Sequence, residues 1–87
     1  MLENLNIKFV KLRIGHLIKV LRKNEKLTQS QLGEKLDLSR ITIQNLESGK
    51  NATLDTLLKT LQHFDKLKAF YDHIESEINN NNYESLY

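Results

Sequence analysis

The chain has 87 residues, which is the length of one domain with or without a tail. Hydrophobic residues make up 39% of the sequence and charged residues 28%, an ordinary globular composition that excludes an intrinsically disordered chain. The absence of Cys excludes a disulfide framework and a thiolate zinc site, and no apolar run approaches the ~20 residues of a membrane span.

The net charge of +2 hides an uneven distribution of charge. Residues 1–50 hold ten Lys and Arg against five Asp and Glu, whereas residues 51–87 hold three Lys against six acidic residues. This asymmetry predicts that the first half meets a polyanion and the second half meets something else. The alternative is a chance scatter of solvated surface charges.

Residues 1–12 form an N-terminal extension whose structure the pattern leaves open. Leu5, Ile7 and Phe9 alternate with polar residues as in a strand, whereas Leu5, Phe9 and Leu12 also fit a helical stripe. The domain itself is expected over residues 13–78. From residue 13 to 23, apolar residues recur at the i, i+3, i+4, i+7 spacing of one helix face that should face the core, namely Ile14, Leu17, Ile18 and Leu21.

Two short helices are predicted next. Thr28 is an N-cap with Gln31 as its capping-box partner, and the helix of about eight residues that follows should end near Asp37. Ser39 caps a second helix over residues 40–48, and Gly49 supplies the positive φ that a helix end favours. The intervening glycine, Gly33, suits a point where the two helices approach closely.

Two further helices complete an all-α prediction. Thr53 caps a helix whose core face would hold Leu54, Leu57, Leu58 and Leu61, and another helix is expected from about Asp65 to Ile78. The asparagines at 79–82 should end it, because Asn competes for its own backbone, so we expect residues 79–87 to be a flexible tail. A compact chain of 10.2 kDa should expose roughly 5,300 Å².

The two short helices make a helix-turn-helix candidate. The stretch LTQSQLGEKLDLSRITIQNLESGK, residues 27–50, resembles the helix-turn-helix of the XRE (Cro/cI-type phage repressor) family, and its flanks IGHLIKVLRKNEK and ATLDTLLKTLQHF resemble that family's first and fourth helices. The resemblance covers about residues 13–64. It implies a compact five-helix repressor-like domain that places the second motif helix in the major groove of double-stranded DNA.

The resemblance also assigns DNA-contacting residues. On the second motif helix, Arg40 would read guanine, Ile41 would pack on a thymine methyl group, and Asn45 would read adenine or hold a phosphate. The adjacent outward-facing candidates are Ser39, Thr42 and Gln44. Residues expected to hold the phosphate backbone are Thr28, Gln29, Ser30, Lys50 and Asn51.

Three other features follow from the family pattern. Arg22 and Glu47 match a family pair that forms an ion pair beneath the motif, where we expect partial burial. Family members often carry Gly at the positions of Lys26 and Asp37. Asp tolerates the left-handed conformation, whereas Lys26 predicts a different or longer turn after the first helix.

The last helix carries more apolar width than terminal packing requires, in Leu67, Phe70, Tyr71, Ile74 and Ile78. We interpret this face as a homodimer interface, because two half-sites ~34 Å apart on one side of DNA need a two-fold protein. The alternative is packing on the first and fourth helices of the same chain.

The expected function is a sequence-specific transcriptional regulator, most simply a repressor. NATLDTLLKTLQHFD with a short acidic C-terminus is further similar to HipB-like antitoxins, which implies a toxin protein as a partner. The alternative is a protein-binding adaptor that uses the last helix and tail. His16, His63 and His73 lack metal-ligand spacing, and no nucleophile or acid–base arrangement is visible, so we expect no metal, cofactor, catalysis or membrane binding.

Overall fold

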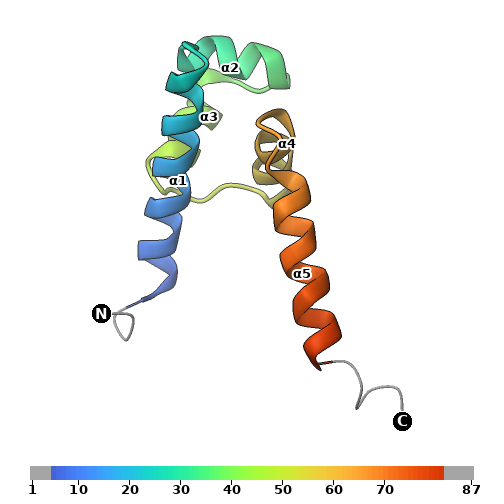
Figure 1. Ribbon diagram of the computed structural model, residues 1–87. Coiled ribbons are helices and arrows are strands. Elements are labelled where there is room, and N and C mark those ends of the chain that lie inside the picture. Colours follow the sequence, from blue (N-terminus) through green and yellow to red (C-terminus); the bar gives the residue numbers. More distant parts are fainter. Residues whose placement is uncertain (1–4, 82–87) are drawn as a thin grey trace.

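The computed structural model describes residues 5–81, and this part of the chain contains five helices and no strand, so the all-α prediction is confirmed. Figure 1 shows their arrangement, with the two motif helices at one end and, at the other, the start of the first helix and the end of the last. The helices are α1 (Ile7–Asn24), α2 (Gln29–Leu36), α3 (Arg40–Glu47), α4 (Leu54–His63) and α5 (Leu67–Asn81).

Helix α1 begins six residues before the predicted start. The Asn6 side chain caps it by accepting a hydrogen bond from the backbone N–H of Phe9 at 2.8 Å. Residues 7–12, assigned to an extension of open structure, are therefore the first turns of α1, and the strand-like alternation of Ile7 and Phe9 was misleading. Residues 1–4 of that extension lie outside the described residues.

The predicted N-caps are confirmed. The Thr28 hydroxyl accepts from the backbone N–H of Gln31 at 3.0 Å, and the Gln31 side chain accepts from the backbone N–H of Thr28 at 2.8 Å. Ser39 and Thr53 likewise cap α3 and α4 through their hydroxyl groups. These local bonds satisfy amides that a helix start leaves without partners, which explains why short-range sequence signals located the helices.

The turns between helices use the left-handed backbone conformation. Gly49 has φ of 77° and Asp37 has φ of 58°, as their positions predicted. Lys26 has φ of 60°, so the expected different turn after the first helix is wrong. This residue adopts the same conformation without the glycine, at a cost of roughly 1–2 kcal/mol for an L-residue.

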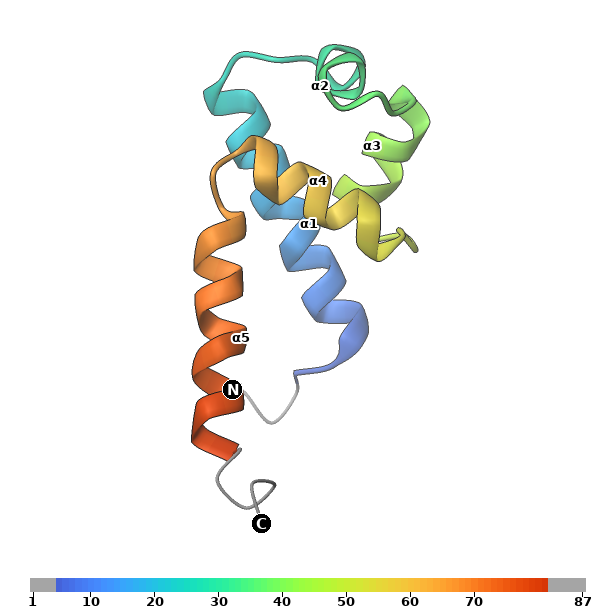
Figure 2. The ribbon, with the colours of Figure 1, turned by 90° about the vertical axis from the view of Figure 1, so that its right-hand side faces the viewer.

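The core lies between α1, α3 and α4, with α2 across one end (Figure 2). Two leucines assigned to core-facing stripes are not buried, because Leu17 is 45% and Leu54 is 69% exposed. Leu17 lies beside the buried face of α1, next to Ile18, and Leu54 is the first residue of α4, so each lies at the edge of the packed region and not within it. The buried hydrophobic residues are Ile18, Leu32, Ile43, Leu46, Leu61 and Phe64.

Two glycines permit the close helix crossings. A Cβ at Gly33 would lie 2.5 Å from the carbonyl oxygen of Leu38, so the predicted close approach is confirmed. A Cβ at Gly15 would collide with the backbone carbonyl of Glu47 at the crossing of α1 and α3. Helix α1 can rest directly on the end of α3 only because position 15 has no side chain.

Two parts of the described chain extend away from the packed centre. The first turns of α1 and most of α5 project from the core as two diverging legs (Figure 1). No residue of α5 is buried.

Helix α5 also continues past its predicted end at Ile78. Asn79, Asn80 and Asn81 are helical, and the Asn81 side chain donates to the backbone carbonyl of Glu77 at 2.7 Å. Asn is only a moderately poor helix former, so three of them need not stop a helix that is already running. The rest of the predicted tail, residues 82–87, lies outside the described residues.

Candidate nucleic-acid interface

Helix α3 presents a mixed surface to solvent. Ile43 and Leu46 face the core, whereas Arg40, Ile41 and Gln44 are exposed. Thr42 and Asn45 are half-buried at the borders of this outer face. Ile41 is 52% exposed although it is a large aliphatic residue. Donors, acceptors and an aliphatic group thus lie side by side on one short helix, which is the mixture that base edges and thymine methyl groups require.

The outer face of α3 is held in place by its own first turn. The Ser39 hydroxyl accepts from the backbone N–H of Thr42 at 3.1 Å and also hydrogen-bonds the Thr42 hydroxyl at 2.9 Å. Arg40 Nη1 donates to Gln44 Oε1 at 3.1 Å, so the guanidinium lies along the helix. Ser39 and Thr42 therefore order the start of α3, and Arg40 and Gln44 keep most of their polar atoms available.

A shallow hollow joins the end of α1 to the starts of α2 and α3. Its volume is about 580 Å³. Three of the predicted phosphate contacts lie around it, and Arg40 brings the predicted base reader to the same place. Two lysines from the end of α1 and the following turn, Lys23 and Lys26, complete a basic rim. The predicted residues on this rim are Thr28, Gln29, Ser30 and Arg40.

Beneath the hollow, Arg22 and Glu47 form the predicted ion pair. Arg22 Nε donates to Glu47 Oε2 at 2.6 Å, Arg22 Nη2 donates to Glu47 Oε1 at 3.0 Å, and the two side chains are only 8% and 4% exposed. The hydrogen bond to Glu47 raises the pKa of Arg22 further above its usual value, against the lowering effect of burial. The pair is more deeply buried than expected.

Two further bonds connect this pair to α2. Arg22 Nη1 donates to the backbone carbonyl of Leu27 at 2.7 Å, and Gln29 Nε2 donates to Glu47 Oε1 at 3.1 Å. Gln29, predicted to meet phosphate through its amide and side chain, thus uses its side-chain nitrogen to join α2 to α3. Because Gln29 of α2 binds the carboxylate of Glu47 in α3, this bond helps to fix the angle between the two motif helices.

The loop after α3 holds the last two predicted phosphate contacts. Lys50 and Asn51 are both exposed. Asn51 Oδ1 accepts from Lys11 Nζ at 2.7 Å, so this loop is attached to the first half of α1. Lys50 and Asn51 lie near Lys11 and not around the hollow that Thr28, Ser30 and Arg40 share.

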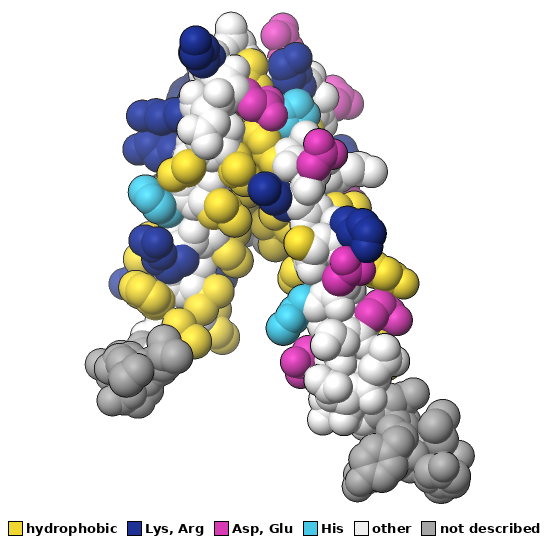
Figure 3. Space-filling model, viewed as in Figure 1, with side chains coloured by type: hydrophobic (Ala, Val, Ile, Leu, Met, Phe, Trp, Pro, Cys, Tyr) yellow, Lys and Arg dark blue, Asp and Glu magenta, His cyan; other side chains and the backbone are white. Residues whose placement is uncertain are grey.

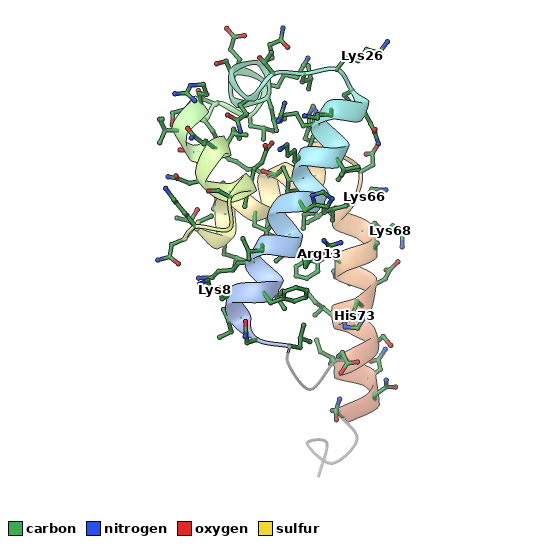
Figure 4. All side chains as sticks on the ribbon, turned by 90° about the vertical axis from the view of Figure 1, so that its left-hand side faces the viewer. Lys8, Arg13, Lys26, Lys66, Lys68 and His73 are labelled. Carbon is green, nitrogen blue, oxygen red and sulfur yellow. The ribbon has the colours of Figure 1, made fainter. Side chains whose placement is uncertain are left out.

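Sequence reasoning missed three basic residues near the motif, namely Lys11, Lys23 and Lys26. The available signal was the charge of residues 7–24, which contain six Lys and Arg and no acidic residue. Figure 3 shows basic side chains along α1, whereas acidic side chains lie over α4 and α5 together with some basic ones. Figure 4 shows Lys8 and Arg13 on α1 and Lys26 in the turn that follows it. The charge asymmetry of the sequence is therefore an asymmetry of the folded surface.

The predicted dimer residues lie on one face of α5. Leu67 is half-buried against the core, and the other four are exposed. With Leu54 and Leu58 of α4, most of them line an apolar hollow of about 960 Å³. The exposed four therefore keep much of their apolar surface uncovered within the described chain, although α5 does contact α4. The exposed four are Phe70, Tyr71, Ile74 and Ile78.

Within residues 5–81, no helix is both long enough and apolar enough to cross a bilayer. The same part of the chain contains no group of three or more His, Asp or Glu residues arranged to hold a metal ion.

The packed two-helix unit with an exposed second helix and a basic rim is the architecture of a helix-turn-helix DNA-binding protein. Comparison with known families agrees, since a family model described as helix-turn-helix matches residues 18–67, more than half of the chain. The chain therefore belongs to the XRE-type helix-turn-helix family and is a DNA-binding transcription regulator. No curated protein matches the chain at a significant level of similarity.

Proposed function

We propose that this regulator is a repressor that binds a two-fold operator as a homodimer, with α3 in the major groove. The observation that carries the proposal is the position of Arg40, which lies at the exposed start of α3 and on the rim of the Lys23 and Lys26 hollow. One side chain thus joins the surface suited to base edges with the surface suited to phosphates.

The proposed division of labour follows from the geometry. Phosphate oxygens would occupy the basic hollow, where Lys23, Lys26 and the exposed hydroxyls of Thr28 and Ser30 offer donors. Arg40 would then reach O6 and N7 of guanine, and Ile41 would contact a thymine methyl group. Asn45, half-buried at the border, would contact adenine or the backbone. Lys50 and Asn51 would hold the strand on the far side of α3.

The exposed face of α5 supports two versions of the biological role. In the first, α5 forms the dimer, and a toxin protein docks away from DNA, so that the chain is an antitoxin that represses its own operon. In the second, the chain is an adaptor whose α5 binds another protein. We favour the first, because the basic side of α1 and the rim of the hollow have no role in the adaptor. In both versions the protein acts in the cytoplasm, by binding and without catalysis or cofactor.

The test is a gel-shift titration on the DNA upstream of the chain's own gene, at two salt concentrations. The control is a scrambled duplex of equal length and composition. We expect tighter binding to the upstream DNA, and a log affinity that falls with log salt at a slope of about −0.9 per phosphate contacted. Equal affinity for both duplexes would contradict a sequence-specific repressor, and binding indifferent to salt would contradict the phosphate contacts. An adaptor would bind neither duplex.

A further inference from the structure

The two legs of the molecule share one feature, an apolar stripe that starts in the core and continues past it. On α5, Leu67 packs against the core and Ile74 and Ile78 continue its face outward. On α1, Ile14 and Leu21 pack against the core. The same heptad-spaced face of α1 includes Ile7, Val10 and Leu17, which are exposed. Each leg thus presents an uncovered helix face of the kind that packs against another helix.

Exposed apolar side chains on both legs supply the surface that such packing needs. Ile7 is 77%, Leu17 is 45% and Ile78 is 47% exposed. The apolar hollow of about 960 Å³ between α4 and α5 also has room for side chains of another helix. Figure 3 shows hydrophobic side chains along the inner edge of the α1 leg.

The charged residues beside the apolar stripe of α5 indicate which kind of surface can cover that stripe. Lys68 pairs with Asp72 within α5 at 2.8 Å, so the net charge of this helix comes from Glu75 and Glu77. These two residues lie on opposite borders of the apolar stripe, because each is three or four residues from a member of it. Packing α5 on α5 of a second copy would bring these acidic borders together, and like charges in close contact are unfavourable.

Helix α1 has the complementary character. It contains no acidic residue, and Arg13 borders the exposed stripe, three residues after Val10 and four before Leu17. Figure 4 shows Arg13 on the N-terminal half of the helix with Lys8. Packing α1 of one copy on α5 of another would therefore combine two apolar stripes with opposite charges at their borders.

The chain direction fits a symmetric pair. Helix α1 runs toward the helix-turn-helix end and α5 runs away from it (Figure 1). An antiparallel contact between α1 of one copy and α5 of the other can thus be repeated by a two-fold axis parallel to the legs. Both helix-turn-helix units then lie at one end of the dimer, as binding to one face of DNA requires.

We propose that two copies of this chain exchange these contacts reciprocally, so that α1 of each copy covers α5 of the other. This inference rests on the proposed homodimer and specifies its surface. The interface has two different halves, an α1 half centred on Val10 and an α5 half centred on Ile74, and each dimer contains the pair twice.

The test introduces one negative charge into each half of the proposed interface, with the variants Val10→Asp and Ile74→Asp. Both side chains are exposed, at 38% and 40%, so each monomer should keep its helical circular dichroism. Matched controls carry an Asp on the opposite face of the same helix, in Lys19→Asp and Ala69→Asp. We expect each interface variant to raise the dimer dissociation constant by roughly tenfold or more in sedimentation velocity, because it buries a charge. The controls should change it little.

The decisive measurement mixes the two interface variants in equal amounts. A mixed dimer contains one contact in which both α1 and α5 are unmodified, whereas each variant alone contains none. We therefore expect the mixture to associate more tightly than either variant by itself, with labelled chains reporting the mixed dimer.

The other outcomes separate the inference from the proposed function. If Ile74→Asp dissociates the dimer while Val10→Asp does not, and mixing recovers nothing, α5 pairs with α5 and the reciprocal exchange is wrong, but the homodimer stands. If the unmodified chain is monomeric at all concentrations and on DNA, both the homodimer and the exchange are wrong. Operator binding is judged independently by the gel shift.

Discussion

The two short helices of the motif and the long helix α5 differ in how far they are buried in the fold. In the first half, two helices of eight residues each bury apolar faces, are connected through one carboxylate and begin at hydroxyl N-caps. In the second, a helix of 15 residues has no buried residue at all. The length of a helix therefore does not predict how much of it is buried. The short helices are fixed by buried side chains and hydrogen bonds between them, whereas α5 leaves an apolar face exposed.

The largest effect on the stability of the first half is expected from the variant Glu47→Ala. It leaves Arg22 charged and buried without its carboxylate, and it removes the acceptor of Gln29. We expect a loss of about 3–5 kcal/mol in the free energy of unfolding, measured by urea denaturation. The double variant Arg22→Met, Glu47→Leu should regain most of it, because no unpaired charge remains buried. A loss below about 1 kcal/mol for Glu47→Ala would contradict a structural role for the pair.

The next test addresses the crossing of α1 and α3. Gly15→Ala places a Cβ against the backbone carbonyls of Leu46 and Glu47, which cannot rotate away as a side chain can. We expect this overpacking to cost about 1–3 kcal/mol, read as a lower thermal midpoint. Lys19→Ala in the same helix is the control, since its side chain is exposed and Ala favours helix. Equal midpoints for the two variants would show that α1 can shift without cost.

The variant Arg40→Ala should change the recognition of DNA bases without changing the stability of the fold. The residue is exposed and bonded only to Gln44 among its described neighbours, so the thermal midpoint should not move. Operator affinity should fall by about 1–3 kcal/mol, with discrimination lost at one base pair in a panel of single-base operator variants. Lys68→Ala, on the face of the molecule assigned to α5, is the matched loss of one positive charge. An unchanged base preference for Arg40→Ala would exclude this residue as a base reader.

Lys26→Gly should change stability and DNA binding in opposite directions. Its φ of 60° favours Gly, so the variant should be more stable by up to about 1 kcal/mol after the entropy of the added Gly is counted. Affinity for DNA should nonetheless decrease, and the salt slope should shrink by about 0.9, because a lysine leaves the rim of the hollow. Asp65→Gly, where φ is 59°, is the control that should gain stability without losing DNA affinity.

The smallest effect is expected on the exposed surface of α5. Lys68→Ala removes an ion pair to Asp72 whose two side chains are 82% and 55% exposed. We expect a change below about 0.5 kcal/mol in the free energy of unfolding, because exposed pairs of this spacing contribute little. Lys precedes Asp here, which is also the less favourable order for such a pair. A loss comparable to that of Glu47→Ala would show that α5 is integrated into the fold after all.

Much of the site could be predicted from the sequence. The hydroxyl caps at Thr28 and Ser39, the left-handed Asp37 and the pairing of Arg22 with Glu47 all follow residue patterns that the structure repeats. The roles of Arg40, Ile41 and Asn45 on DNA remain predictions. The basic contribution of Lys23 and Lys26 was missed, because it depends on the end of α1 lying beside the start of α3 rather than on any local motif.

The amino-acid order alone determined where helices begin and turn, since caps, periodicity and backbone preference act over three or four neighbouring positions. It could not determine where the core would end. Leu17, Leu54 and the exposed members of the α5 stripe have the same helical spacing as the buried residues, yet they are left uncovered. Burial depends on contacts with residues distant in the chain, so the tertiary structure alone decided which apolar faces are buried and which remain exposed.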